Sequence, residues 1–334
     1  MRHWAVLSAA VAVCVAAAQS LASAQVAELV GSRASGMGGA FVAVASDSSA
    51  TWWNPAGLAA GPFFDMALGR GVVETGKELP VGRQKASWVA LASPVVGVSY
   101  YRFRITDIRP FDPTGEDAAG REDRRAGVPV RSLAASHLGV TLVQTLISGV
   151  HAGATVKYAR GTVSAGRDDG LAAPSELLDR GEALEAGEAR GRFDLDVGVL
   201  AVAGALRLGA RVRNVLEPEF DTVRLPRQTR VGVALDAEAV GSVPLTVAFD
   251  ADVDAYMTVS GPRRVLALGA EQWFLARRLG VRAGGRMNAV GARERSATAG
   301  VSLAVRSGLY VDGHLVRGGS ADEKGWGLAT RVSF

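Results

Sequence analysis

The chain of 334 residues is almost without cysteine, and its one cysteine, Cys14, lies in an apolar run near the N-terminus. Arg2 and His3 precede this run, and Ala22-Ser23-Ala24 follows it. A short apolar run between a basic start and a small-x-small triplet is typical of a secretory signal peptide, so we expect residues 1–24 to be removed. The mature chain then has no cysteine, which excludes disulfides and thiolate metal sites.

Long hydrophobic runs and an excess of one charge are also missing. After residue 24 no stretch approaches the roughly 18 apolar residues of a membrane-spanning helix, which excludes a helical membrane protein. The 37 basic residues barely outnumber the 33 acidic ones. Such a small and dispersed surplus does not indicate nucleic-acid binding.

Patterns that would indicate an enzyme are scarce. The remaining histidines, His137, His151 and His314, have no partners at metal-ligand spacing, so we expect no metal. The glycine cluster at residues 36–39 follows no strand and precedes no Lys-Ser/Thr pair, so we expect no nucleotide and no other cofactor. His137 and His151 fall on neighbouring expected strands, which leaves a hydrolase formally open, but we expect no catalytic residue.

What the chain does contain is alternation with a period of two. Near the C-terminus one face carries Trp326, Leu328, Thr330 and Val332, and the other carries Gly327, Ala329, Arg331 and Ser333. The pattern recurs at residues 193–199, 206–213, 230–236, 245–254 and 301–306, and it is poor at 95–106 and 264–276. Apolar residues on one face and small or charged ones on the other indicate strands between lipid and a polar lumen. The expected fold class is therefore all-β, a transmembrane antiparallel β-barrel.

The links between these segments alternate in length. Long polar links fall near residues 74–84, 107–131, 164–191, 216–226, 255–263, 288–295 and 317–324, and short ones near 93–94, 147–148, 203–204, 237–242, 277–278 and 306–308. These links predict about 14 strands, and their asymmetry is typical of an outer-membrane barrel with both ends in the periplasm. In one long link Pro174 and the candidate cap Ser175 predict a short helix to about Ala186, which would act as a lid.

Charged residues on the inner parity of the strands predict a polar lumen. They are Asp194, Asp196, Arg207, Arg211, Arg213, Arg230, Asp250, Asp252, Asp254, Arg282, Arg286 and Arg331. Opposite charges across a lumen form buried ion pairs that set strand register and pore shape, and this structural pairing is our main interpretation. Direct contact with a substrate is the alternative.

Residues 25–62 form a segment longer than a tether to the first strand needs. Asn54 followed by Pro55 is a helix start, and the tryptophans before it need burial. The residues that we expect to form a gate are Gly36, Gly38, Gly39, Trp53, Asn54, Pro55, Ala56 and Gly57. We expect an N-terminal hatch of short helical turns packed inside the barrel of residues 63–334, whereas the alternative is a disordered periplasmic leader.

Two stretches resemble the N-terminus of FadL/TodX-type and PorV/PorQ-type outer-membrane proteins. They are RASGMGGAFVAVASD at residues 33–47 and WNPAGL at residues 53–58. The resemblance implies a fourteen-stranded barrel that is plugged by a hatch containing the Asn-Pro-Ala motif. It also implies that the terminal Phe334 is the signal read by the barrel assembly machinery.

The two branches of this resemblance imply different functions. The FadL branch implies passive transport of small hydrophobic or amphipathic compounds through a hatch-plugged lumen in the outer membrane of a Gram-negative cell. The PorV/PorQ branch, which residues 33–47 match more closely, implies a secretion-accessory or structural barrel that acts through its outer loops. Expected partners are outer-membrane lipid, the assembly machinery, and a hydrophobic small molecule or secretion-system proteins. The charged lumen argues against a long-chain fatty acid, and transport is the first hypothesis.

Overall fold

The computed structural model describes residues 22–23, 29–109, 127–221, 223–241, 243–258, 261–291, 293–319 and 323–334. The expected signal peptide lies outside these ranges, except for the two residues of β1 (Ala22–Ser23), which pair with β10 (Val223–Arg224). Within these ranges, no helix is both long and apolar enough to cross a membrane.

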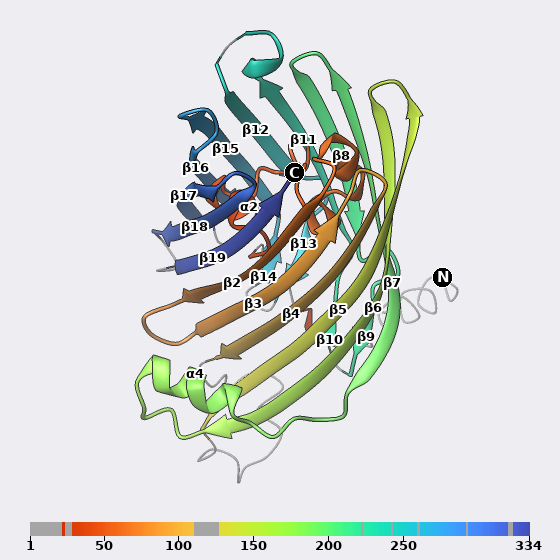
Figure 1. Cartoon of the computed structure of the whole chain (residues 1–334). Coiled ribbons are helices and arrows are strands. Elements are labelled where there is room, and N and C mark those ends of the chain that lie inside the picture. Colours follow the sequence, from red (N-terminus) through yellow and green to blue (C-terminus); the bar gives the residue numbers. More distant parts are fainter. Residues whose placement is uncertain are drawn as a thin grey trace, which may run out of the picture.

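Fourteen antiparallel strands close into one barrel (Figure 1). In chain order they are β2 (Asp65–Thr75), β3 (Val81–Ala92), β4 (Val96–Ile108), β5 (Val128–Ile147), β6 (Val150–Asp168), β7 (Arg190–Ala203), β8 (Leu206–Arg213), β11 (Gln228–Asp236), β12 (Leu245–Asp252), β15 (Val265–Phe274), β16 (Leu279–Asn288), β17 (Arg295–Arg306), β18 (Leu309–Gly318) and β19 (Lys324–Ser333). Each strand pairs with the next one along this series, and β19 closes the barrel by pairing with β2. The predicted fold class and number of strands are confirmed.

The two ends of the barrel differ in the length of their links, as predicted. At one end, called the inner end, lie both Asp65 and Ser333, which pair with each other, and the short turns. The longest links lie at the other end, called the outer end, although the inner link at residues 237–244 is longer than some of the outer ones. They hold β9 (Glu219–Phe220), β10, β13 (Tyr256–Thr258), β14 (Gly261–Arg263) and the helix α4 (Pro174–Glu182), while η4 (Ala237–Ala239) lies in an inner link.

Alternation along the strands gives the wall two different faces. On β4, for example, Val98 and Tyr100 are 45% and 43% exposed, while Tyr101 and Phe103 point inward and are buried. The outward face is an apolar belt on most strands, which is the surface that a membrane-spanning barrel presents to lipid.

Residues 29–62, called the inner segment, lie inside the barrel (Figure 1). They hold α2 (Ser32–Gly36), α3 (Ala50–Trp53) and η1 (Pro55–Ala60). α2 contacts β16 to β19, and η1 contacts β5 to β7, so the segment touches opposite parts of the wall. Helices this short are not stable alone, and burial against the wall therefore keeps them folded.

The helix predicted in the third outer link exists but does not cover the lumen. α4 begins at Pro174 after Ala173, with no side-chain cap, so Ser175 is not the predicted cap. Leu177 and Leu178 pack on Val81, Ile108 and Val130, which form an apolar cluster on the outward face of β3 to β5. α4 therefore covers this cluster from outside the barrel, next to the outer ends of β3 to β5 (Figure 1).

Candidate functional site

Asn54 joins two parts of the inner segment and binds them to the wall. Its side-chain amide donates hydrogen bonds to the carbonyl oxygens of Val42, at 2.8 Å, and of Val199 on β7, at 3.0 Å. Its Oδ1 accepts from the backbone N–H of Ala56 at 3.2 Å, which caps η1 before Pro55 as the sequence predicts. Asn54 is fully buried, so these partners replace the water it loses.

Glycines of the wall allow this close contact. A Cβ atom on Gly198 would lie 2.1 Å from Asn54 Oδ1, and one on Gly153 would lie 2.4 Å from the nitrogen of Ala56. The same holds around the barrel, where the inner segment approaches Gly209 on β8, Gly232 on β11, Gly269 on β15, Gly284 on β16 and Gly300 on β17. We call these seven residues the glycine seat. Only a residue without a side chain lets another backbone come so near.

The glycines of the inner segment have local roles. Gly38 and Gly39 have φ of 70° and 84°, in the left-handed region that favours glycine. Gly36 lies against Gly300, and a Cβ on Gly57 would lie 2.1 Å from the carbonyl oxygen of Ala45. Each of these four expected residues is therefore needed for compact turns or close packing.

A carboxylate of β15 holds the inner segment by charge. Glu271 accepts from Arg33 Nε at 2.6 Å and Nη2 at 3.0 Å, and from Arg282 Nε at 2.7 Å. Trp273 Nε1 also donates to it at 2.7 Å. Burial opposes the charge on Arg33, but Glu271 and Asp47 together raise the pKa of its guanidinium. The site is thus a buried carboxylate between two cations.

Sequence reasoning found Arg282 but missed Arg33 and Glu271. Glu271 does lie on the inner parity of β15. Bulky Trp273 and Phe274 on opposite faces made the alternation of this strand look poor, and Trp273 is in fact a partner of the same carboxylate.

Asp250, Arg211 and Arg213 all contact the inner segment. Asp250 Oδ2 accepts from the backbone N–H groups of Phe41 and Val42, both at 2.8 Å. Arg211 Nη1 donates to the carbonyl oxygen of Trp52 at 3.2 Å. The guanidinium of Arg213 lies 3.9 Å from the centroid of the Trp52 ring, a cation–π contact. These wall residues therefore bind the backbone and rings of the inner segment.

The remaining predicted charges form ion pairs, with one exception. Arg230 pairs with Asp252 at 2.6 Å, Asp194 and Asp196 pair with Lys157 at 3.1 and 2.7 Å, Arg331 pairs with Asp312 at 3.4 Å and Asp65 at 3.6 Å, Arg207 pairs with Asp236, and Arg286 pairs with Glu323. Asp254 lies beyond the end of β12 and is exposed, so it is not in the lumen. Lys157, the shared partner of two aspartates, was missed although it lies on the inner parity of β6.

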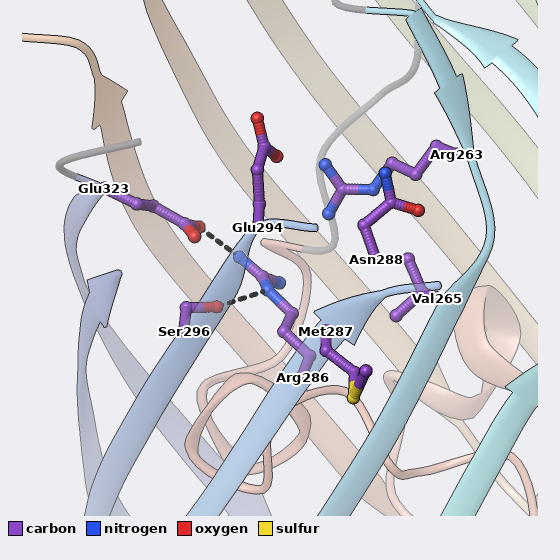
Figure 2. A pocket seen from close by; sticks show the side chains of 8 residues that line it. All are labelled: Arg263, Val265, Arg286, Met287, Asn288, Glu294, Ser296 and Glu323. Atoms are coloured by element: carbon purple, nitrogen blue, oxygen red, sulfur yellow. Dashed lines mark hydrogen bonds and ion pairs between the residues drawn. The ribbon is translucent and has the colours of Figure 1, made fainter. Parts of the chain in front are cut away.

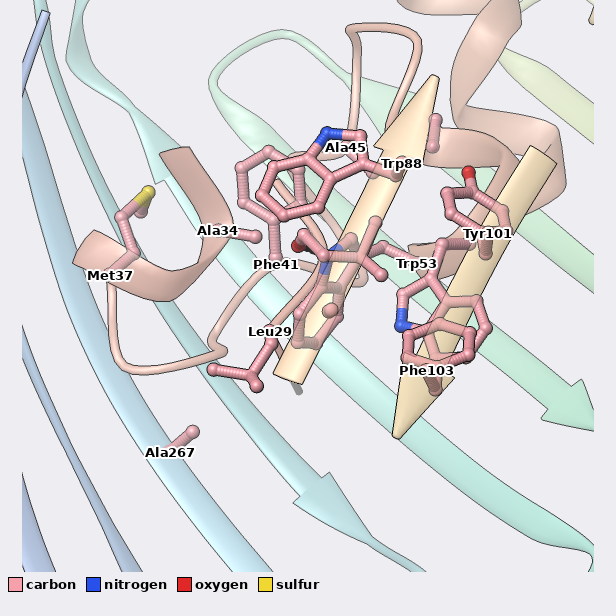
Figure 3. Close-up of a cluster of buried hydrophobic side chains, with 14 of the residues drawn as sticks. Leu29, Ala34, Met37, Phe41, Ala45, Trp53, Trp88, Tyr101, Phe103 and Ala267 are labelled. Carbon is pink, nitrogen blue, oxygen red and sulfur yellow. Dashed lines mark hydrogen bonds between the residues drawn. The ribbon is translucent and has the colours of Figure 1, made fainter. Parts of the chain in front are cut away.

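Apolar side chains occupy the other side of the lumen. Trp53 and Phe41 of the inner segment lie near Trp88, Tyr101 and Phe103 of β3 and β4 (Figure 3). The same contiguous cluster reaches Ile105 and Leu133 on the wall and, in an outer link, Phe220, Val223 and Leu225. Apolar contact therefore continues through the lumen, from the outer link to the inner segment.

The two histidines considered for catalysis are apart and differently placed. His137 is buried, with its ring centroid 6.0 Å from that of Trp52 and 5.5 Å from that of Phe103. In the described chain neither ring nitrogen of His137 has a hydrogen-bond partner. His151 lies near the inner end, where Thr145 Oγ1 is 2.9 Å from its Nδ1. His137 thus belongs to the aromatic packing.

A pocket between the outer ends of β15 to β17 is small and polar. Figure 2 shows Arg286 reaching toward Ser296 and Glu323, with Arg263, Asn288 and Glu294 also on its lining. Its volume is about 10 Å³, room for about one water molecule. This pocket does not fit an apolar compound.

Phe334 pairs with Phe64 at the inner end of the barrel, next to the pairing of β19 with β2. Its N–H donates to the carbonyl oxygen of Phe64 at 2.9 Å, and the two rings stack with centroids 6.3 Å apart. The side chain is 69% exposed, so it is available to a partner.

The chain is similar to known proteins in two ways. A family model described as "F plasmid transfer operon, TraF, protein" matches residues 85–252, from β3 to the end of β12. No curated protein matches the sequence. Solved structures share the fold: the toluene transporter TbuX of Ralstonia pickettii is 14% identical, with a TM-score of 0.63 over 92% of this chain and 99% of that one.

Two further structures are similar to the same degree. The monoaromatic hydrocarbon channel CymD is 13% identical, with a TM-score of 0.60 over 93% of this chain and 99% of that one. A FadL homologue of Pseudomonas aeruginosa is 10% identical, with a TM-score of 0.60 over 93% of this chain and all (100%) of that one. At these identities the likeness shows the fold alone.

Proposed function

The chain belongs to the family described as "F plasmid transfer operon, TraF, protein", and we propose that it is an outer-membrane barrel through which small hydrophobic or amphipathic compounds cross passively. The observation that carries this proposal is the contiguous apolar cluster inside the lumen, from Phe220 and Leu225 through Ile105 and Leu133 to the inner segment. A barrel named as a toluene transporter and one named as a monoaromatic hydrocarbon channel have the same fold, which supports it.

In this proposal residues 25–62 are the hatch. The inner segment, its described part, fills the lumen, and its backbone rests on the glycine seat. A compound therefore crosses only when the hatch shifts. Asn54 holds the hatch in place, because its side chain forms hydrogen bonds both within the hatch, with Val42 and Ala56, and to the wall, with Val199.

The chemistry of the lumen favours a small aromatic cargo. Trp52 lies beside Tyr101 and Phe103, with ring centroids 5.2 and 4.9 Å away, and such faces pack well on an aromatic ring. The facing wall carries paired charges, which a long acyl chain would have to desolvate. We therefore infer a compact apolar molecule rather than a long-chain fatty acid.

Uptake by whole Gram-negative cells that produce the barrel tests the proposal, because their outer leaflet slows hydrophobic solutes. Ile105→Asn places a polar side chain in the apolar cluster, and we expect the initial uptake rate of labelled toluene to fall roughly tenfold, as a buried unpaired amide costs about 1–3 kcal/mol. Thr246→Asn, on the inner parity of β12, is the matched control and should leave uptake unchanged. Equal uptake by both variants, with equal amounts of folded barrel, would refute the proposal.

Asn54→Ala tests the hatch itself. Loss of three hydrogen bonds should loosen the hatch and raise toluene uptake severalfold, with the barrel still folded on unheated gels. Unchanged uptake would show that Asn54 does not hold the hatch in place.

The accessory role implied by the PorV/PorQ branch has no counterpart among the structures above. The accessory role predicts that other proteins copurify with the barrel in mild detergent, and that they are lost when residues 107–131 or 164–191 are trimmed. Uptake that persists after this trimming favours transport.

A further inference from the structure

Two Tyr-x-Arg triplets lie close together on the outward face of the barrel. Tyr100-Tyr101-Arg102 belongs to β4 and Tyr158-Ala159-Arg160 to β6, with β5 between them. The registers align them: Tyr100 and Tyr158 both pair with Leu138, and Arg102 and Arg160 both pair with Ser136. The result is a row of Tyr, Leu and Tyr next to a row of Arg, Ser and Arg.

The first and third residues of both triplets face away from the lumen, as does Leu138 between them. Tyr100, Leu138 and Tyr158 are 43%, 53% and 43% exposed, and both arginines are exposed. Neighbouring strands lie about 4.8 Å apart, so the two arginines are about 10 Å apart with the small Ser136 between them. This leaves a place for an anion, with a hydroxyl at its floor and a guanidinium on each side.

The charges beyond this row are already used by the protein. Lys85 pairs with Glu182 at the end of α4, and Arg104 donates to the carbonyl oxygen of the same residue at 3.1 Å. By contrast, no ion pair joins Arg102 or Arg160 to a carboxylate in the described part of the chain. The row of Arg102, Ser136 and Arg160 thus lies on the wall between the row of Tyr100, Leu138 and Tyr158 and Arg104, which contacts α4.

We propose that Arg102, Ser136 and Arg160 bind a phosphate of lipid A, the phosphorylated glycolipid of the outer leaflet, while an acyl chain lies on Leu138 between the two tyrosines. Guanidinium groups bind phosphate through paired hydrogen bonds, and tyrosines prefer the boundary between hydrocarbon and headgroups. Arginine facing lipid is costly deep in a bilayer but not at its surface, which suits this position next to an aromatic row. The inference rests on the outer-membrane location proposed above, but not on transport.

Retention of lipid A by the purified barrel tests the site. The chain from residue 25 onward is reconstituted in nanodiscs of phosphatidylcholine with a trace of lipid A, and bound lipid is measured by native mass spectrometry after gentle release. We expect the double variant Arg102→Gln with Arg160→Gln to retain at least tenfold less lipid A. Arg317→Gln, an exposed arginine on β18, is the matched control and should retain as much as the wild type.

Four results would overturn the proposal. The first three are equal retention by the double variant, equal loss in the Arg317→Gln control, and equal retention of lipid A from which the phosphates have been removed. Preference for phosphatidylglycerol over lipid A would assign the site to another lipid and also refute it. A folded band on unheated gels shows that a variant is not misfolded, so that its lower retention reports a loss of lipid A binding. Toluene uptake is measured separately and shows whether transport fails independently of lipid A binding.

Discussion

The two sides of the lumen hold the inner segment by different means. On β7 to β16 the contacts are largely polar. Glu271 forms an ion pair with Arg33, Asp250 accepts hydrogen bonds from two backbone N–H groups, and the carbonyl oxygen of Val199 accepts one from Asn54. On β2 to β5 they are largely apolar and aromatic. Polar ties on that side are few in the described residues; Asp65 accepts from the N–H of Ser48 at 2.8 Å, and Tyr101 bonds to Thr51.

This difference indicates where the inner segment opens. When apolar surfaces separate, an apolar solute can replace the contacts that they lose. When a buried ion pair separates, its charges are left buried without a partner, which costs much more free energy. If the barrel transports as proposed, we expect the segment to pivot on the charged side and the cargo to pass along β2 to β5. The first three of the following predictions test this contrast.

The largest effect is expected from Glu271→Gln. It removes the carboxylate that two buried arginines share, so the free energy of unfolding in urea should fall by about 3–5 kcal/mol. Glu238→Gln is the control, because its pair with Arg277 is exposed at an inner turn and is worth about 1 kcal/mol or less. Similar losses in the two variants would mean that the charged side does not hold the segment.

Gly198→Ala tests the glycine seat. The new methyl group would overlap Asn54 Oδ1, so we expect a loss of about 1–3 kcal/mol and faster proteolysis within residues 29–62. Gly319→Ala, where no atom lies within 4 Å of the new Cβ, should change neither. A stable Gly198→Ala protein with a protected segment would argue against close seating.

Tyr101→Phe tests the apolar side. It removes the hydrogen bond to Thr51 but keeps the ring against Trp52, so the loss should be about 1 kcal/mol. Denaturant unfolding next to the Glu271→Gln variant gives the ratio of the two sides. If Tyr101→Phe costs as much, the contrast between them is wrong.

The smallest effect concerns pH and α4, outside the lumen. The hydrogen bond from Arg83 lowers the pKa of Asp179 below 3.8. Because the folded-state pKa is the lower one, the stabilisation of α4 is present above pH 3.8 and is lost as the pH falls through the folded-state value. Hydrogen exchange of residues 174–182 should therefore show less protection at pH 3 than expected from the intrinsic rates, and the inner segment should not change. Protection lost equally in both would join α4 to the hatch.

Alternation and link lengths were enough to predict the barrel, because most of the lipid-facing strands repeat the same two-residue pattern. They also identified most of the lumen charges and the Asn54 cap, since both depend on local sequence, but Asp254 is not in the lumen and Lys157 and Glu271 were missed. Pairing was beyond this reasoning: Asp250 serves backbone N–H groups 208 and 209 residues away, and parity gives the face of a residue but not its partner across the lumen. The outward position of α4 escaped for a similar reason, because Val81, Ile108 and Val130 form an apolar patch only when three strands are side by side.

The central claim is that the inner segment shifts to let a small apolar compound pass. Its most direct measurement compares toluene uptake by cells with the wild type, with the Asn54→Ala variant and with no barrel. The account predicts uptake above background for the wild type and severalfold faster uptake for Asn54→Ala. Wild-type uptake at the level of cells without the barrel, with folded barrel present in the outer membrane, would contradict it.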